Sequence, residues 1–399
     1  MHCPFMAGVN PNILSWARET AGLDRESAAR KIDLKAARGR SGAERLAALE
    51  AGEEQPSAPL LQRMAHGYRR PLLTFYAAEV PAPAELGQDF RTLPEEGDPS
   101  NVLLAALLRD VKARQGVVRD LLEDDEDAER VGLVGAQRGN RNASQIADAL
   151  QRAIGFERMV FRARRTAEEA FAYLRRLVEA KGVFVLLAGD CGHHSTAIDV
   201  RVFRGFAIAD PLAPFIVIND QDAKSAWSFT LLHELAHLLL GESGISGGPP
   251  QGAVEQLCND TAAAVLIVPA EILNVPIVGT DADVVEIGVL ADQARVSRAM
   301  VAYQLLRAER IPAVRWEALR DRFQAERIAN RARERDERQG RTGPNWYTVR
   351  RHRLGDALLS VARRGMTEGT LTPTRAARML GVKPMSVYPL LAEPKRANA

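Results

Sequence analysis

The sequence predicts a mostly helical α+β protein in which helical modules flank a small sheet. Apolar residues recur at helical spacing through most of the chain, and runs of strand length gather between positions 183 and 218. With 399 residues, the chain is long enough for roughly two or three domains with cores of their own. Its 46% hydrophobic and 26% charged residues are ordinary for a globular protein and exclude a disordered chain.

The first part of the chain predicts a compact bundle of short helices, with caps and breakers at suitable positions. Pro11 suits the first position of a helix, Gly22 ends it, and Asp24 is a fitting cap for the next. Helices are expected at 11–21, after Asp24, at 43–51 and at 58–68. The stretch 79–87 is interpreted as a linker, and a long helix is expected at about 100–122.

The middle of the chain predicts a helix, a small sheet and two apolar helices. Thr166 is a candidate cap for a helix over 166–181, with Glu169 completing a capping box. The expected strands lie at 183–187, 197–206 and 215–218. An apolar helix follows at 230–241, with Gly241 as its C-cap, and a second at 254–268 is ended by Pro269.

The last part is helical and basic. Helices are expected at 284–294, 297–308 and 315–339, followed by a module at 346–391 whose residues 372–384 are reminiscent of a helix-turn-helix. Residues 295–399 carry 23 basic and 10 acidic side chains, whereas the rest of the chain is acidic. Two interpretations stay open: this region binds nucleic acid or an acidic partner, or its charge offsets the acidic part within the molecule.

The chemistry-bearing motif is His233-Glu234-Leu235-Ala236-His237. On a helix, residues four apart share a face, so two imidazoles can bind one metal ion, and Glu234 lies next to them as a general base. The downstream helix offers Glu255 as a third ligand, and Asn259, one turn later, as a partner for a ligand histidine's free ring N–H. The alternative is a buried helix whose histidines are satisfied by core hydrogen bonds.

Two imidazoles and one carboxylate form the ligand set of catalytic zinc sites. Zn²⁺ is therefore the expected cofactor, although such a site would also accept Mn²⁺, Co²⁺ or Cu²⁺. His193 and His194 lie in a predicted loop and are interpreted as surface residues. The buried thiol of Cys258 is expected to be inert.

The N-terminal bundle resembles the Cro/repressor-type (XRE) helix-turn-helix domain of bacterial regulators. The resemblance rests on residues 16–23, on Ala28-Ala29 and on Leu49-Glu50-Ala51-Gly52-Glu53. It implies that residues 11–80 bind DNA through the third helix. The segment 33–42 is longer than the usual turn, so a fold retained for protein–protein contact is the alternative.

The chain as a whole resembles the ImmA/IrrE family of zinc metallopeptidases. The resemblance rests on Arg204-Gly205-Phe206-Ala207, on residues 229–237, on the helix from Glu255 to Pro269 and on Asp89-Phe90-Arg91. Thr261 and Cys258 depart from the family's usual Phe and Ala. The resemblance implies a zincin-like (gluzincin) endopeptidase in which His233, His237 and Glu255 ligate zinc and Glu234 is the catalytic base.

The function implied by this resemblance is cleavage of a DNA-binding transcriptional repressor, in a stress response or in the induction of a mobile element. The rival interpretation is a DNA-binding regulator whose peptidase-like domain senses a ligand or metal without proteolysis. The expected order is a helix-turn-helix domain at 1–85, a helical connector at 86–165, a zincin-like metallopeptidase core at 166–278, a helix-turn-helix-like extension at 279–340 and a basic helical module at 341–399.

The expected location is the cytoplasm. The first residues lack the basic and apolar regions of a secretion signal, and the longest apolar run is too short to span a bilayer. The three cysteines (Cys3, Cys191 and Cys258) form no C-x-x-C pair, which suits a reducing compartment.

Overall fold

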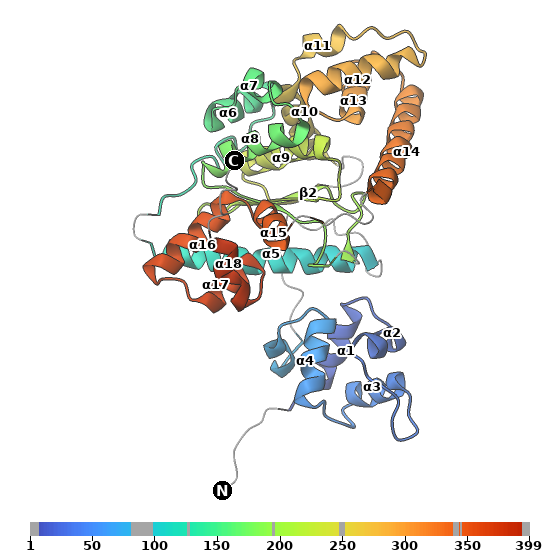
Figure 1. Ribbon diagram of the computed structural model, residues 1–399, viewed down its shortest axis with the longest axis vertical. Helices are drawn as coiled ribbons and strands as arrows, with labels where there is room; N and C mark the ends of the chain where they lie inside the picture. The colour runs from blue at the N-terminus through green and yellow to red at the C-terminus, as the bar shows by residue number, and fades with distance from the viewer. Residues whose placement is uncertain are drawn as a thin grey trace. The chain divides into compact units, whose positions relative to one another are not determined.

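The computed structural model describes residues 8–80, 99–125, 128–193, 196–246, 252–337, 343 and 345–392. The chain divides into two compact units, Met1–Leu107 and Leu108–Ala399, and each has a hydrophobic core of its own (Figure 1). Helices dominate and one small mixed sheet is present, so the predicted α+β class is confirmed. The segment Asp89-Phe90-Arg91, which contributed to the family resemblance, lies outside the described residues.

The first unit contains the predicted bundle of short helices. Its elements are α1 (Pro11–Glu19), α2 (Arg25–Lys31), α3 (Gly42–Glu50), α4 (Ala58–Gly67) and the 3-10 helix η1 (Leu72–Tyr76). The side chain of Asp24 accepts a hydrogen bond from the N–H of Ser27, and Ser41 and Glu44 form a capping box on α3. These caps satisfy backbone donors that a short helix otherwise leaves open. The helices enclose a core that includes Ile13, Leu46, Leu61 and Phe75.

The long connection between α2 and α3 is a folded loop. Ala37 and Arg40 pair as a short bridge, and the tip is turned by Arg38 and Gly39, both with positive φ. A Cβ at Gly42 would lie 2.1 Å from the carbonyl oxygen of Leu34, so the return of the loop onto α3 requires glycine there. In this folded loop the basic side chains Lys35, Arg38 and Arg40 are exposed.

The second unit is organised around a four-stranded sheet in the order β1-β3-β2-β4. The strands are β1 (Phe184–Leu187), β2 (Gly205–Ile208), β3 (Phe215–Ile218) and β4 (Gly244–Ser246). β1 is parallel to β3, whereas β2 pairs antiparallel with both β3 and β4. The strand predicted at 197–206 was placed too early: residues 197–204 are loop and turn, and the strand begins at Gly205 and runs to Ile208. β4 was not predicted.

Among the described residues, eight helices of this unit contribute to one core with the sheet, together with Leu319 and Phe323 of the later helix α14 (Ala313–Glu337). They are α6 (Ala143–Ile154), α7 (Arg158–Arg162), α8 (Ala167–Glu179), α9 (Lys224–Leu240), α10 (Ala253–Leu266), α11 (Pro269–Leu273), α12 (Ala282–Ala294) and α13 (Arg298–Arg307). The helices α6 and α7, expected in a connector, pack into this core instead. Pro269 does not end α10, which stops at Leu266, but begins α11.

The remaining helices are α5 (Pro99–Glu123), α14 (Ala313–Glu337), α15 (Trp346–Leu354), α16 (Asp356–Glu368), α17 (Pro373–Leu380) and α18 (Val387–Leu391), with the 3-10 turn η4 (Pro384–Ser386) between the last two. Helices α8 and α9 lie on one side of the sheet, and the second half of α5 with α15–α18 lies on the other (Figure 1). None of the helices in the described part of the chain combines the length and apolar character needed to cross a membrane.

Within the second unit, a buried ion pair on α8 connects α8 with the helices α15 and α16. Arg175 and Glu179 lie one turn apart on α8, at 3.0 Å from each other. Arg175 donates to the carbonyl oxygen of His352 at the end of α15, and Glu179 accepts from the N–H of Asp356 at the start of α16. A Cβ on the intervening Gly355 would lie 2.1 Å from Glu179 Oε1. The pair therefore caps two helices at once.

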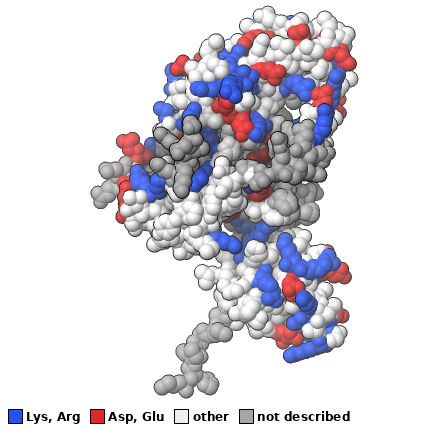
Figure 2. All heavy atoms as spheres, in the orientation of Figure 1, with Lys and Arg blue, Asp and Glu red and all other residues white. Residues whose placement is uncertain are grey.

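Part of the basic charge of residues 295–399 is paired with acidic side chains elsewhere in the second unit. The pairs are Arg307–Asp260, Arg315–Asp283, Arg322–Asp281, Arg327–Asp222, Arg353–Asp190, Arg353–Asp220, Arg364–Asp125 and Arg375–Asp120. On the face seen in Figure 2, blue and red side chains are interspersed over the larger unit. These contacts favour the interpretation that the charge of this region offsets the acidic part of the chain.

Candidate metal centre

Helix α9 carries both histidines of the motif. Every residue from Thr230 to Leu240 is buried, because the helix packs between the sheet and the helices α8 and α10. His233 and His237 are one turn apart, and their Nε2 atoms lie 3.1 Å from each other. Gly241 ends the helix in the left-handed conformation, as its sequence position predicts.

Helix α10 supplies the third candidate ligand. It packs against α9 and carries Glu255 in its first turn, where an acidic side chain also suits the helix dipole. Glu255 Oε2 lies 3.3 Å from His233 Nε2, and Oε1 lies 3.1 Å from His237 Nε2. The two helices thus bring His233, His237 and Glu255 to one point, with their ligand atoms within 4.8 Å of one another.

These three side chains fit a divalent metal ion. A tetrahedral site with metal–ligand distances of about 2.0–2.1 Å has its ligand atoms about 3.3 Å apart. The separations in this cluster are 3.1 to 3.3 Å. Small imidazole–carboxylate clusters of this kind are otherwise expensive to bury, since each donor atom is taken out of water. The geometry and the donor set both match a metal site.

Glu234 lies beside the cluster as its neighbour in sequence. Its carboxyl group is completely buried. The hydroxyl of Ser246, on strand β4, donates to Glu234 Oε1 over 2.5 Å. The other oxygen, Oε2, is buried without a hydrogen-bond partner among the described residues. A buried carboxylate with one free oxygen is suited to take a proton from a bound reactant.

The electrostatics of the cluster separate two acids with different roles. Burial raises the pKa of Glu234 above its ordinary value. Burial acts in the same direction on Glu255, but the hydrogen bonds to His233 and His237 prevail and lower the pKa of Glu255 to about 2. Burial disfavours the charged form of His237, yet the neighbouring Cys258 thiol and Glu255 carboxylate raise its pKa well above the ordinary value. Glu255 is thus the anionic carboxylate of the cluster, and Glu234 is the carboxyl group with the greater proton affinity.

The remaining residues considered from the sequence, Asn259, Cys258 and His193, lie outside the set of candidate ligands. Asn259 is half-buried on α10 and makes no hydrogen bond to either histidine, whose Nδ1 atoms are buried without partners among the described residues. Cys258 is fully buried next to His237, and burial raises the pKa of its thiol, as expected for an inert cysteine. His193 lies in the loop after β1 and outside the cluster.

Sequence reasoning missed two residues that contact the candidate base. They are Ser246, described above, and Gly205, which pairs with it across β2 and β4. A Cβ at Gly205 would lie 2.8 Å from Glu234 Oε1 and 2.7 Å from Thr230 Cγ2. The glycine was part of the family resemblance, but no local pattern connects it with β4, because strand pairing is decided by residues far apart in the chain.

A buried helix pair that presents two imidazoles and a carboxylate at one point, with a second carboxylate alongside, is suited to hold a divalent metal ion. Residues 195–306 match the family model Peptidase M78, described as the IrrE N-terminal-like domain. The matched segment contains β2–β4, α9–α12 and all but the last residue of α13, and it supports a metallopeptidase-like function that requires a divalent metal. Comparisons with curated proteins and with solved structures gave no match.

Proposed function

We propose that this chain is a zinc-dependent endopeptidase of the ImmA/IrrE type that cleaves a DNA-binding transcriptional repressor. The observation that carries the proposal is the convergence of the ligand atoms of His233, His237 and Glu255 beside the buried carboxyl group of Glu234. The Peptidase M78 match over the same segment supports it.

The residues divide the chemistry between them. His233, His237 and Glu255 would hold the ion, which when bound polarises the peptide carbonyl and lowers the pKa of the attacking water. Glu234 takes the proton of that water through its free oxygen and returns it to the leaving amine. Its raised pKa suits both halves of this transfer, because a carboxyl group with greater proton affinity is a better base and can still release the proton.

The first unit supports the choice of a repressor as substrate. It is a separate helical bundle with its own core, and its sequence resembles repressor-type helix-turn-helix domains. We propose that residues 11–80 recruit the substrate, either by contacting the repressor or by locating it at its operator. A covalent tether of this kind raises the effective concentration of substrate at the metal centre.

The test compares new protein N-termini in cells that express the wild type and cells that express Glu234→Gln. A general base contributes roughly 10²- to 10⁴-fold to the rate, so the variant should lose cleavage while keeping its metal. Glu317→Gln on α14, an exposed glutamate, is the matched control and should behave as the wild type. A repressor fragment that depends on Glu234 would identify the substrate. No Glu234-dependent terminus, together with full zinc content, would contradict the proposal.

A second candidate is a DNA-binding regulator whose metal centre senses an ion or ligand. The observation that favours it is the folded loop between α2 and α3, where Lys35, Arg38 and Arg40 are all exposed. Cations on such a loop suit contact with a phosphate backbone. In this case promoter occupancy would depend on these three residues and be indifferent to Glu234→Gln. For a protease we expect the opposite: the effect on gene expression would be lost in Glu234→Gln.

A further inference from the structure

We propose that Ser246 and Gly205 form a positioning pair for Glu234, so that one carboxylate oxygen is held and the other is left for proton transfer. This inference rests on the proposed peptidase function and assigns the residues that orient its base. The two residues are paired in the register of β2 and β4. Ser246 hydrogen-bonds the carboxyl group of Glu234, and a Cβ at Gly205 would collide with the same group.

The hydroxyl of Ser246 fixes one oxygen of Glu234. It donates to Oε1 over 2.5 Å, and both residues are buried, with Ser246 8% exposed and Glu234 fully enclosed. A short hydrogen bond to a carboxylate away from water is among the stronger polar contacts in proteins. Because Oε1 is engaged, Oε2 remains as the oxygen without a partner among the described residues. The hydrogen bond thereby distinguishes the two oxygens of the base.

Gly205 supplies the space in which this contact forms. An added Cβ would lie 2.8 Å from Glu234 Oε1 and 3.1 Å from Glu234 Cγ, which is closer than carbon atoms normally approach. The glycine has no positive φ, so backbone freedom does not explain it. Close approach of the carboxyl group and of Thr230 to the strand is the physical reason for glycine at this position.

The backbone holds the pair in register. The N–H of Arg204 donates to the carbonyl oxygen of Ser246 over 2.7 Å, next to the Gly205–Ser246 pairing. β2 is in turn paired with β3 on its other side, so Ser246 is attached through β2 to the interior of the sheet. A hydroxyl anchored in this way orients its acceptor better than one on a mobile loop.

The experiment uses the zinc-loaded full chain and a quenched fluorescent peptide that spans the Glu234-dependent cleavage site. Ser246→Ala should lower kcat by about tenfold to hundredfold, as expected for loss of a hydrogen bond to a charged group, with KM and zinc content unchanged. Ser246→Thr keeps the hydroxyl and should recover most of the activity. The control is Ser228→Ala on α9, since the buried hydroxyl of Ser228 has no partner among the described residues and should be dispensable.

A second variant tests the glycine. Gly205→Ala is made in a Thr230→Ser background. The second change removes the Thr230 methyl group, which would lie 2.7 Å from the new Cβ, so that the remaining clash is with the side chain of Glu234. The double variant should lose kcat relative to Thr230→Ser alone while still binding zinc.

The outcomes separate the two proposals. Full activity of Ser246→Ala, or a parallel loss of activity and zinc, overturns the positioning role while the peptidase function stands. A wild type without any Glu234-dependent cleavage site overturns the peptidase function, and the positioning role with it.

Discussion

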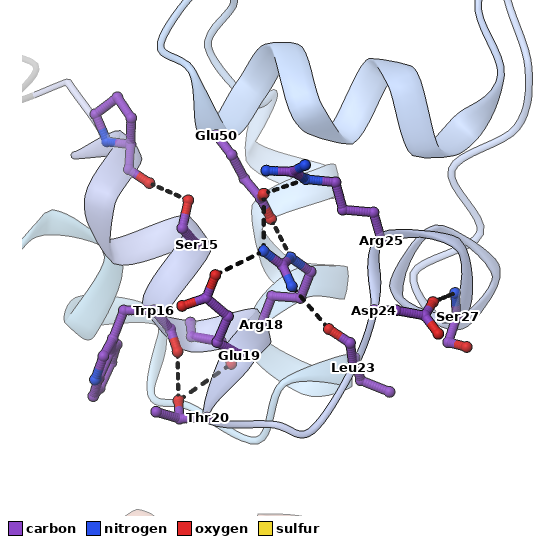
Figure 3. A network of polar contacts seen from close by, with 12 residues as sticks. Ser15, Trp16, Arg18, Glu19, Thr20, Leu23, Asp24, Arg25, Ser27 and Glu50 are labelled. Atoms are coloured by element: carbon purple, nitrogen blue, oxygen red, sulfur yellow. Dashed lines mark hydrogen bonds and ion pairs between the residues drawn. The ribbon is translucent and has the colours of Figure 1, made fainter. Parts of the chain in front are cut away.

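Each unit of the molecule buries a cluster of charged side chains, and the two clusters differ in how completely their atoms are paired. In the first unit, Glu50 accepts from Arg18 Nε at 2.6 Å and from Arg25 Nε at 2.9 Å, and its side chain is only 1% exposed (Figure 3). Arg18 also donates to the carbonyl oxygen of Leu23 and to Glu19. Both oxygens of the buried carboxylate are thus hydrogen-bonded by the chain itself.

The candidate metal centre of the second unit is largely buried but incompletely paired. The Nδ1 atoms of His233 and His237 and the Oε2 atom of Glu234 have no hydrogen-bond partner among the described residues. Buried polar atoms are usually paired, and Glu234 Oε2 differs from the other unpaired atoms because it lies beside the three candidate ligands, where a reactant could contact it. The comparison indicates that the cluster around Glu50 stabilises the fold, whereas the cluster around Glu234 is arranged to act on something else.

The largest expected effect is on the stability of the first unit. Glu50→Ala leaves Arg18 buried without its partner, which costs about 3–5 kcal/mol of unfolding free energy. Chemical denaturation followed by the fluorescence of Trp16, the tryptophan of this unit, measures it. Zinc affinity should be unchanged, since Glu50 belongs to the other unit.

Glu53→Ala is the matched control for this substitution. Glu53 is exposed and lies 3.7 Å from Arg40, so its loss should cost no more than about 1 kcal/mol. If Glu50→Ala were as mild as Glu53→Ala, the network of Figure 3 would not be the stabilising element that its complete hydrogen bonding indicates.

The next effect concerns zinc and the second unit. Zinc at about 100 times its Kd should stabilise this unit by about 2.7 kcal/mol and leave the first unit unaffected, because the ligands belong to one core only. Fluorescence of Trp227, which packs edge-on against Phe171, follows the unfolding of the second unit. A chelator should reverse the shift, and His237→Ala should abolish it. Equal stabilisation of both units would contradict the assignment of the ligands.

The local parts of both clusters can be predicted from sequence, and the non-local parts cannot. The spacing of His233 and His237 on an apolar helix is a property of four consecutive peptide units, and caps such as Asp24 and Ser297 act within three residues. The position of Glu255 beside the histidines could also be predicted, because it falls on the next helix, which packs against α9.

The sheet was predicted least well, because its strands are selected by pairing with residues far away in the sequence. The apolar run 197–206 has the composition of a strand, but pairing with β3 and β4 selects Gly205–Ile208 instead. β4 has only three residues, too few for any alternation to show. Ser246 therefore carries no local signal of its contact with Glu234. The charge of residues 295–399 was visible in the sequence, but its acidic partners became apparent only in the folded chain.

The smallest expected effect is the pH dependence of zinc binding. In the metal-free protein the pKa of His237 is raised well above its ordinary value, so this ligand holds a proton that zinc must displace. The apparent affinity should fall by about tenfold for each pH unit below that pKa, since one proton competes for the site. Glu255, with its pKa lowered to about 2, is already ionised and adds nothing to this slope.

Calorimetry in buffers of different ionisation enthalpy counts the released proton. An affinity that stays constant between about pH 6 and about pH 8 would mean that His237 is already neutral before the metal arrives. The three candidate ligands would then already be in the protonation state that zinc requires. In that respect the cluster would resemble the one around Glu50, whose carboxylate is fully hydrogen-bonded without any bound ion.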